Sequence, residues 1–365
     1  MFLKSKVSLF FTLVSVVAFS AQAQEKMEIG KFKSRVIYQA ASHCPAPLVI
    51  MTPGSGSHGP EEMMPGSMTA DGKEHSIFAA FSEGLVKGGV GTLAVGKPGI
   101  EFFSSFAPET WTYDKNLYAQ LGWQDLIDNV KEAVSAAQQM PCVDKNRIYI
   151  LGHSEGTQVA IDLARQNPGL VQGLILVGFS GEPLAEVLDW QLFRRAIDLF
   201  ISPDVDSNHD GVVTQEEGRL WPDFQFPWSP ALMSISLFDL EKMLRQVPAL
   251  QQEYAKASQA LIWQGVFNRA PIYPEAAALK EDIYVFTGSV DAQTRPEDAL
   301  KLQAECVKVQ KKNCWVQIVP GFGHAMSEPT GPRHHPLLDL NLGPVDERFK
   351  DILQNWAVSV SAPKF

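Results

Sequence analysis

The chain lacks an excess of positive charge. It carries 31 Lys and Arg against 41 Asp and Glu, which gives a formal net charge of −10. Because nucleic acids and anionic lipid surfaces bind clustered basic side chains, this balance argues against both kinds of partner. The sequence also contains no internal repeat and no low-complexity tract. A hydrophobic content of 45% in 365 residues is enough for one large core with a substantial insertion.

Long apolar runs are missing too, with one short exception near the start of the chain. The run at residues 7–19 follows a head that contains Lys4 and Lys6, and it precedes an Ala-Gln-Ala sequence at residues 21–23. Such a run is too short to span a bilayer, and the pattern is typical of a cleavable export signal. We therefore expect residues 1–23 to be a signal peptide. An uncleaved anchor would need a longer apolar core. The mature protein should be exported, periplasmic or secreted, without stable membrane insertion.

Cysteine is scarce, with four residues: Cys44, Cys142, Cys306 and Cys314. In an exported chain, oxidising conditions favour pairing, and the sequence alone allows three connectivities. Cys44 and Cys142 each precede an apolar run, so they meet if the two runs form neighbouring parallel strands. Cys306 and Cys314 bracket a short connection between a helical stretch and the next run. We predict the pairs Cys44–Cys142 and Cys306–Cys314, whereas four reduced thiols would be expected of a cytosolic protein.

Short apolar runs alternate with helical patterns along most of the chain. Six runs are typical of buried parallel strands, at residues 48–51, 90–95, 148–151, 174–178, 283–287 and 315–319. Helical stretches lie between most of them, at residues 76–87, 117–139, 157–166 and 296–311. Residues 33–39 alternate in character and fit an antiparallel strand at the start of the sheet. This order predicts an α/β fold with a doubly wound, mostly parallel sheet.

The alternation breaks once, between residues 183 and 274, where no strand is apparent. Four of the eight tryptophans fall there: Trp190, Trp221, Trp228 and Trp263. We predict a helical lid at residues 183–274, inserted into a core of residues 24–182 and 275–365. Most of its aromatic side chains should pack the lid onto the core, and a few should line an acyl or aromatic pocket.

The sequence Gly-His-Ser-Glu-Gly at residues 152–156 lies directly between a strand run and a helical stretch. This setting is typical of a nucleophile elbow, in which a serine stands on a sharp turn. Gly152 and Gly156 lack the Cβ atoms that would crowd such a turn. Ser154 is therefore the candidate nucleophile. His153 should point away from it and act as a packing residue.

A serine hydroxyl needs a base to accept its proton, and the base needs an acid to orient it. Asp291 and His324 follow the last two strand runs, at positions where parallel strands bring side chains to one edge of the sheet. We predict that His324 is the base and that Asp291 orients it. Glu182, which follows the preceding strand run, is the alternative acid.

Two backbone N–H groups should stabilise the oxyanion of the tetrahedral intermediate. One is the amide of Glu155, at the positive end of the helix that follows the serine. The other should come from the glycine-rich loop after residues 48–51, and we predict the amide of Ser55.

These motifs together resemble the α/β-hydrolase superfamily, nearest to exported hydrolases and serine aminopeptidase-like proteins that carry Gly-His-Ser-Glu-Gly. The resemblance covers residues 48–181 and 283–356. It implies the α/β-hydrolase fold and the chain order of nucleophile, acid and base seen here in Ser154, Asp291 and His324. Many relatives have His-Gly in the oxyanion loop, where this chain has Pro53-Gly54. No organic cofactor is expected.

Residues 206–217 resemble the calcium loop of an EF-hand, with Gly211 at position six and an apolar residue at position eight. The predicted ligands occupy positions one, three, five, seven, nine and twelve: Asp206, Asn208, Asp210, Val212 (through its carbonyl), Thr214 and Glu217. No second loop is apparent to pair with it. We expect a structural calcium ion that orders the lid, the alternative being a solvated acidic turn. No closely spaced ligand set suggests zinc.

The sequence thus predicts an exported serine hydrolase that cleaves an ester of a small-molecule or peptide acyl substrate, like a carboxylesterase. A serine peptidase or a thioesterase would use the same residues, because the triad does not encode the leaving group. Acyl transfer to another alcohol is a further possibility. An alternative of another class is a calcium-dependent binding protein without catalysis. The presence of all three triad residues argues against it.

Overall fold

The computed structural model describes residues 24–69, 71–105, 113–221, 224, 226–329 and 344–362. The expected signal peptide at residues 1–23 lies outside these ranges. Within them, no helix is both long and apolar enough to cross a membrane.

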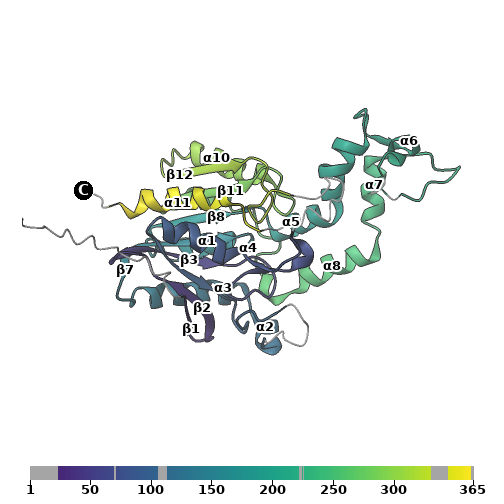
Figure 1. Ribbon diagram of the computed structural model, residues 1–365. Coiled ribbons are helices and arrows are strands. Elements are labelled where there is room, and N and C mark those ends of the chain that lie inside the picture. Colours follow the sequence, from purple (N-terminus) through teal and green to yellow (C-terminus); the bar gives the residue numbers. More distant parts are fainter. Residues whose placement is uncertain are drawn as a thin grey trace, which may run out of the picture.

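Eight strands form one sheet in the order β1-β2-β6-β3-β7-β8-β11-β12 (Figure 1). Their bounds are β1 Glu25–Ile29, β2 Ser34–Gln39, β3 Ala46–Thr52, β6 Gly91–Val95, β7 Val143–His153, β8 Gly173–Val177, β11 Asp282–Gly288 and β12 Cys314–Val319. The pairs β1/β2 and β2/β6 are antiparallel, and all other neighbours are parallel. The predicted fold class is confirmed, and β2 is the expected antiparallel strand. β1 and a small separate ladder of β4 (Met63–Met64) and β5 (His75–Ser76) were not predicted.

Helices cover both faces of the sheet. One face carries α1 (Ile77–Lys87) and α11 (Glu347–Ser361), and the other carries α3 (Trp123–Ala137), α4 (Glu155–Gln166) and α10 (Pro296–Lys308). Successive residues of β3 alternate between the two cores: Leu48 and Ile50 pack on the second face, Val49 and Met51 on the first. Burial on both faces explains why β3, β6 and β8 appear in the sequence as continuous apolar runs. The edge strand β12 instead alternates between half-buried and exposed residues, so the expectation of a buried strand at residues 315–319 is wrong.

The helix expected at residues 117–139 is in fact two helices, α2 (Lys115–Gln120) and α3. Gly122 separates them in an extended conformation, and its N–H donates to the carboxylate of Asp125 in the first turn of α3. This capping contact begins a new helix, so the apolar periodicity continues across a break in the backbone.

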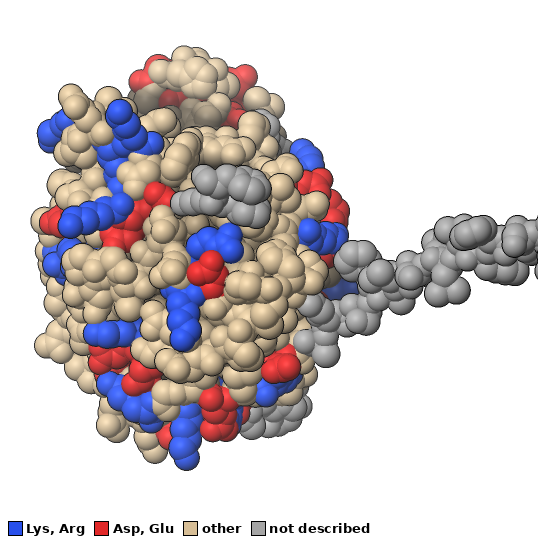
Figure 2. Space-filling model, turned by 90° about the vertical axis from the view of Figure 1, so that its left-hand side faces the viewer, with Lys and Arg blue, Asp and Glu red and all other residues tan. Residues whose placement is uncertain are grey.

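Both predicted disulfides are present. Cys44–Cys142 links the segments that lead into β3 and β7, which are neighbours in the sheet. Cys306–Cys314 links the end of α10 to the start of β12. Charged side chains of both signs are intermixed over one face of the molecule (Figure 2).

The segment at residues 183–274, between β8 and β11, is mostly helical and projects from the core, with α6 and α7 far from the sheet (Figure 1). Its elements are α5 Leu184–Asp189, the π-helical η3 Trp190–Arg194 and η4 Ile197–Val205, β9 Val212–Thr214, α6 Gln215–Arg219, β10 Ser234–Ser236, α7 Leu237–Leu244, α8 Pro248–Gln259, the 3-10 turn η5 Leu261–Trp263 and the start of α9 Tyr273–Ala277. The expectation of no strand here is wrong, because β9 and β10 pair. Each has three residues, too few for a visible alternation.

Candidate active site

Ser154 occupies a sharp turn between β7 and α4, with φ 54° and ψ −122°. Positive φ is uncommon for a residue with a side chain and is found where the surroundings enforce it. A Cβ on Gly152 would collide with the Gly156 carbonyl, and one on Gly156 would collide with the Thr52 carbonyl. The two glycines therefore permit the turn that exposes Ser154 at the end of the sheet.

Asp291 and His324 are in direct contact. His324 Nδ1 lies 2.9 Å from Asp291 Oδ2 and 3.1 Å from Oδ1, and both side chains are buried. Asp291 also accepts hydrogen bonds from the backbone amides of Gln293 and Thr294 and from Thr294 Oγ1. Burial alone would raise the pKa of Asp291, but the imidazole of His324 and these hydrogen bonds outweigh it, so its pKa lies below the usual value. The carboxylate thus stays ionised and fixes His324 Nδ1 as a proton donor.

His324 and Ser154 line the same cavity, which has a volume of about 220 Å³. Within the described residues, Ser154 Oγ makes no hydrogen bond to His324. Such contacts often tighten only when substrate binds. Glu182, the alternative acid, faces elsewhere: it accepts hydrogen bonds from Tyr273 Oη at 3.1 Å and Lys301 Nζ at 2.5 Å.

The two predicted oxyanion donors flank the nucleophile. Glu155 is the first residue of α4, and Ser55 lines both cavities that reach Ser154. The N–H of Gly54 is already used, because it donates to Glu62 Oε1 at 2.7 Å. This leaves Ser55 as the candidate in that loop, and its role stays a prediction.

The side chain of Glu155 forms a buried ion pair that the sequence did not indicate. Lys97 Nζ lies 2.7 Å from Glu155 Oε1, and Trp263 Nε1 donates to Glu155 Oε2 at 2.5 Å. Burial would lower the pKa of Lys97, but Glu155 outweighs it, and the pKa is raised. Since Trp263 belongs to η5, this pair joins the returning end of the insertion to the elbow.

His153 is buried as predicted, but it does more than pack. Its Nδ1 lies 2.9 Å from Glu62 Oε1, and its Nε2 lies 3.2 Å from the carbonyl oxygen of His324. The description of His153 as a packing residue is therefore incomplete. Glu62 could not be found from the sequence, because it stands 91 residues away in a loop without a motif.

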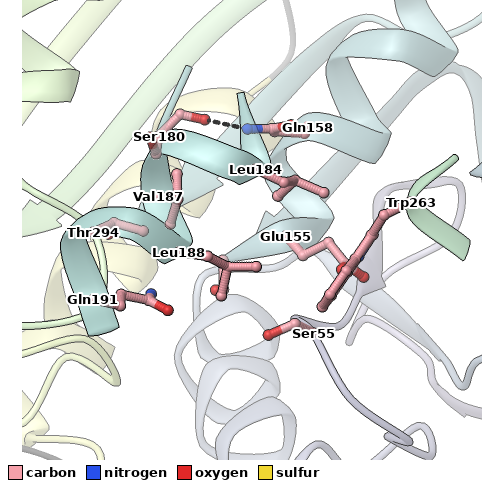
Figure 3. Close-up of a pocket in the computed structure, with 11 residues that line it drawn as sticks. Ser55, Glu155, Gln158, Ser180, Leu184, Val187, Leu188, Gln191, Trp263 and Thr294 are labelled. Atoms are coloured by element: carbon pink, nitrogen blue, oxygen red, sulfur yellow. Dashed lines mark hydrogen bonds between the residues drawn. The ribbon is translucent and has the colours of Figure 1, made fainter. Parts of the chain in front are cut away.

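Two cavities of different size meet at Ser154. The smaller, of about 60 Å³, is lined on its apolar side by Leu184, Val187, Leu188 and Trp263 (Figure 3). The larger, of about 220 Å³, has an apolar lining of Met63, Met64, Met68 and Ile77. All four of these apolar side chains belong to residues 183–274, but only Trp263 is aromatic, whereas a few aromatic side chains of this segment were expected to line a pocket.

The loop at residues 206–217 holds its predicted ligands in a tight turn. The buried carboxylate of Asp206 accepts from the amides of Asp210 and Gly211, at 3.2 and 2.9 Å. Glu217 is occupied by hydrogen bonds from Thr214, at 2.9 Å from the amide and 2.8 Å from Oγ1, and from Ser207. In the described part of the chain, no three His, Cys, Asp or Glu side chains converge closely enough to hold a metal ion.

The loop pairs with a short strand, β10, although no second calcium loop was expected from the sequence. β9, which spans positions seven to nine of the loop, pairs with β10, and Val213 stands opposite Ile235. Each strand leads into a helix that a hydroxyl caps: Thr214 caps α6 and Ser236 caps α7. The segment that precedes β10, residues 228–233, contains no Asp or Asn, so it carries no motif that the sequence could reveal.

No protein-family model matches the chain. Among curated proteins, the esterase EstD of Thermotoga maritima is 27% identical over 148 residues, which are 40% of this chain and 30% of that esterase. The chain thus matches less than a third of the length of this relative.

Solved structures of similar shape are found at low sequence identity. Carboxyl esterase 2 of Tuber melanosporum has a TM-score of 0.51 at 10% identity, over 96% of this chain and 90% of that one. The 2,6-dihydroxy-pseudo-oxynicotine hydrolase has a TM-score of 0.51 at 13% identity, over 93% and 68%. The proline iminopeptidase of Mycobacterium smegmatis has a TM-score of 0.50 at 12% identity, over 93% and 99%. With its mostly parallel sheet and these neighbours, the chain has the α/β-hydrolase fold.

Proposed function

We propose that the protein is a serine hydrolase that cleaves carboxylic esters through an acyl-enzyme on Ser154. The observation that carries the proposal is the arrangement of three residues: Ser154 on its strained turn, with His324 lining the same cavity and Asp291 bonded to His324 Nδ1. The partial identity with an esterase supports the same reaction class.

In this mechanism Ser154 Oγ attacks the ester carbonyl carbon while His324 Nε2 takes its proton. The oxyanion is stabilised by the amides of Glu155 and Ser55, and Asp291 stabilises the imidazolium. As the intermediate collapses, the C–O bond to the alcohol breaks and His324 returns the proton to the leaving oxygen. Water, activated by His324, then attacks the acyl-serine in the same way and releases the acid.

A substrate panel separates this proposal from peptide and thioester cleavage. We expect kcat/KM to be highest for nitrophenyl esters, lower for acyl thioesters and lowest for aminoacyl nitroanilides. A preference for the anilides would replace the esterase proposal by a peptidase one, which the fold of the proline iminopeptidase also accommodates. Product analysis with added alcohols would reveal acyl transfer.

We further propose that the protein is exported and works in the periplasm or outside the cell. The two disulfides, with no free cysteine among the described residues, support an oxidising compartment.

The two cavities predict which esters react fastest. The leaving oxygen must receive its proton from His324, so the leaving group belongs in the larger cavity, which His324 lines, and the acyl group in the smaller one. We expect nitrophenyl acetate and butyrate to exceed the octanoate in kcat/KM by about tenfold or more.

Leu188→Ala should move this preference toward longer acyl groups, since Leu188 walls the smaller cavity. The matched control is Leu199→Ala, because Leu199 is exposed in η4 and outside both cavities. A wild-type optimum at octanoate, or the same shift in both variants, would contradict the assignment of the cavities.

We propose in addition that the loop at residues 206–217 binds calcium. All its ligand types are oxygens, as this ion requires, and the ion pairs of the insertion within the described ranges leave Asp206, Asp210 and Glu217 without a cation. Asp206 is buried, and a buried carboxylate without a counter-charge is costly. Binding requires Glu217 to turn from Thr214 and Ser207 toward the ion. The ion would then order the insertion.

Calcium should therefore raise the melting temperature. At a free calcium concentration 100 times Kd, binding adds about 2.7 kcal/mol to the free energy of unfolding. Glu217→Gln should weaken this response. The control Glu216→Gln removes the same charge at the neighbouring position and should respond like the wild type. A melting temperature that neither calcium nor a chelator changes would refute the calcium proposal.

A further inference from the structure

Glu62 brings together two of the loops that form the active site. It lies between β3 and β4, is 3% exposed and has a left-handed backbone with φ 45°. Its Oε1 accepts the N–H of Gly54 at 2.7 Å and lies 2.9 Å from His153 Nδ1. One carboxylate oxygen thus ties the oxyanion loop to the residue next to the nucleophile.

His153 extends the connection to the third loop. Its Nε2 lies 3.2 Å from the carbonyl oxygen of His324, and the two rings are tilted by 41° with their centroids 4.9 Å apart. A carbonyl oxygen can only accept, and an ionised carboxylate can only accept, so both ring nitrogens of His153 must carry protons. With Glu62 ionised, the contacts place a histidinium beside His324, balanced by the negative charge of Glu62.

The electrostatics of the two side chains agree with this assignment. Burial would lower the pKa of His153, but Glu62 outweighs it and the pKa is raised. Burial would raise the pKa of Glu62, but His153 outweighs it and the pKa is lowered. The charge of His58 also lowers the pKa of Glu62, and the charge of Asp291 also raises the pKa of His153.

We propose that Glu62 and His153 are positioning residues that hold the oxyanion loop and the His324 loop in register with Ser154. Neither needs to touch the reacting atoms. Glu62 holds the N–H of Gly54, in the Pro53–Gly54 peptide one residue before the Ser55 amide, and His153 holds the carbonyl oxygen of His324 and thus the reach of its imidazole. This inference rests on the proposed serine-hydrolase mechanism.

A purely stabilising role fits the structure less well. The second oxygen of Glu62 is buried and has no hydrogen-bond partner among the described residues. A buried charged pair with an unsatisfied oxygen contributes little to stability compared with an apolar pair of the same size. Its placement across three catalytic loops, in contrast, matters for geometry, because a displacement of about 1 Å can cost about 10²-fold in rate.

The test uses Glu62→Gln, which keeps the shape and can still accept from Gly54 but cannot hold a histidinium. His153→Asn retains a donor toward Glu62 and removes the donor to the His324 carbonyl. We expect kcat per active site, counted by fluorophosphonate titration, to fall about 10²-fold in either variant with KM nearly unchanged. The double variant should lose little more than the worse single one, since both act through one connection.

Glu61→Gln is the matched control. Glu61 is adjacent in sequence and partly buried, but its side chain makes no contact with Gly54, His153 or the His324 loop within the described residues. Counting active sites separates a loss of folded protein from a loss of rate, and the second variant keeps the test open if one does not fold.

Unchanged kcat per site in Glu62→Gln and His153→Asn, or an equal fall in Glu61→Gln, would overturn the positioning role and leave the hydrolase proposal standing. A wild-type protein that neither hydrolyses esters nor is titrated would overturn both.

Discussion

Ser154→Ala should abolish ester hydrolysis, with kcat reduced about 10⁴- to 10⁶-fold. Without the hydroxyl no acyl-enzyme can form, and what remains is the rate supported by binding and the oxyanion donors alone. The fold should be unaffected, because alanine meets the same backbone strain at φ 54° as serine does. The measurement is kcat for nitrophenyl butyrate together with the melting temperature.

Ser180→Ala is the control for this experiment. Ser180 lines the same small cavity, but its hydroxyl is bonded to Asp298 and has no place in the mechanism. It should keep most of the activity. Substantial hydrolysis by Ser154→Ala would show that another group is the nucleophile.

Asp291→Asn should lower kcat by about 10⁴-fold while the protein stays folded. An amide at this position can turn its NH₂ toward His324 Nδ1 and so favour the tautomer that cannot accept the proton of Ser154. Glu182→Gln alters the alternative acid, which is bonded to Tyr273 and Lys301, and should leave kcat within a small factor of the wild type. The opposite ranking of the two variants would assign the orienting role to Glu182.

Asp291→Asn should also change the stability of the protein in acid. The pKa of Asp291 is lowered in the folded state, so its carboxylate stabilises the fold fully above the unfolded pKa of about 3.9 and loses this contribution as pH falls through the folded value. Asp291→Asn should therefore flatten the decline of melting temperature below about pH 4. Asp298→Asn, which removes the charge of another buried carboxylate, is a control for the activity measurement. It tests whether the fall in kcat is specific to Asp291.

The parts of the fold that the sequence predicts share a physical cause. β3, β8 and residues 148–151 of β7 are buried on both faces, so their residues are apolar, aromatic or small, and the runs are visible without partners. The elbow is visible because only glycine fits at residues 152 and 156. The disulfides follow from the parallel pairing of β3 with β7 and from the short link between α10 and β12.

The contacts that the sequence did not reveal are those between distant loops. Glu62 meets His153 across 91 residues, Lys97 meets Glu155 across 58, and Trp263 meets Glu155 across 108. No pattern of spacing encodes such pairs, because each depends on where the sheet places the ends of its strands. β9 and β10 were missed for a different reason, since three-residue strands carry no periodic signal.

A covalent reaction at Ser154 tests the proposed active site more directly than any rate measurement. A fluorophosphonate should add once per molecule, and peptide mapping should locate the adduct on Ser154, with no labelling of Ser154→Ala and slow labelling of a variant that lacks His324. An adduct on another residue, or equal labelling of Ser154→Ala, would contradict the claim that these loops assemble a reactive serine.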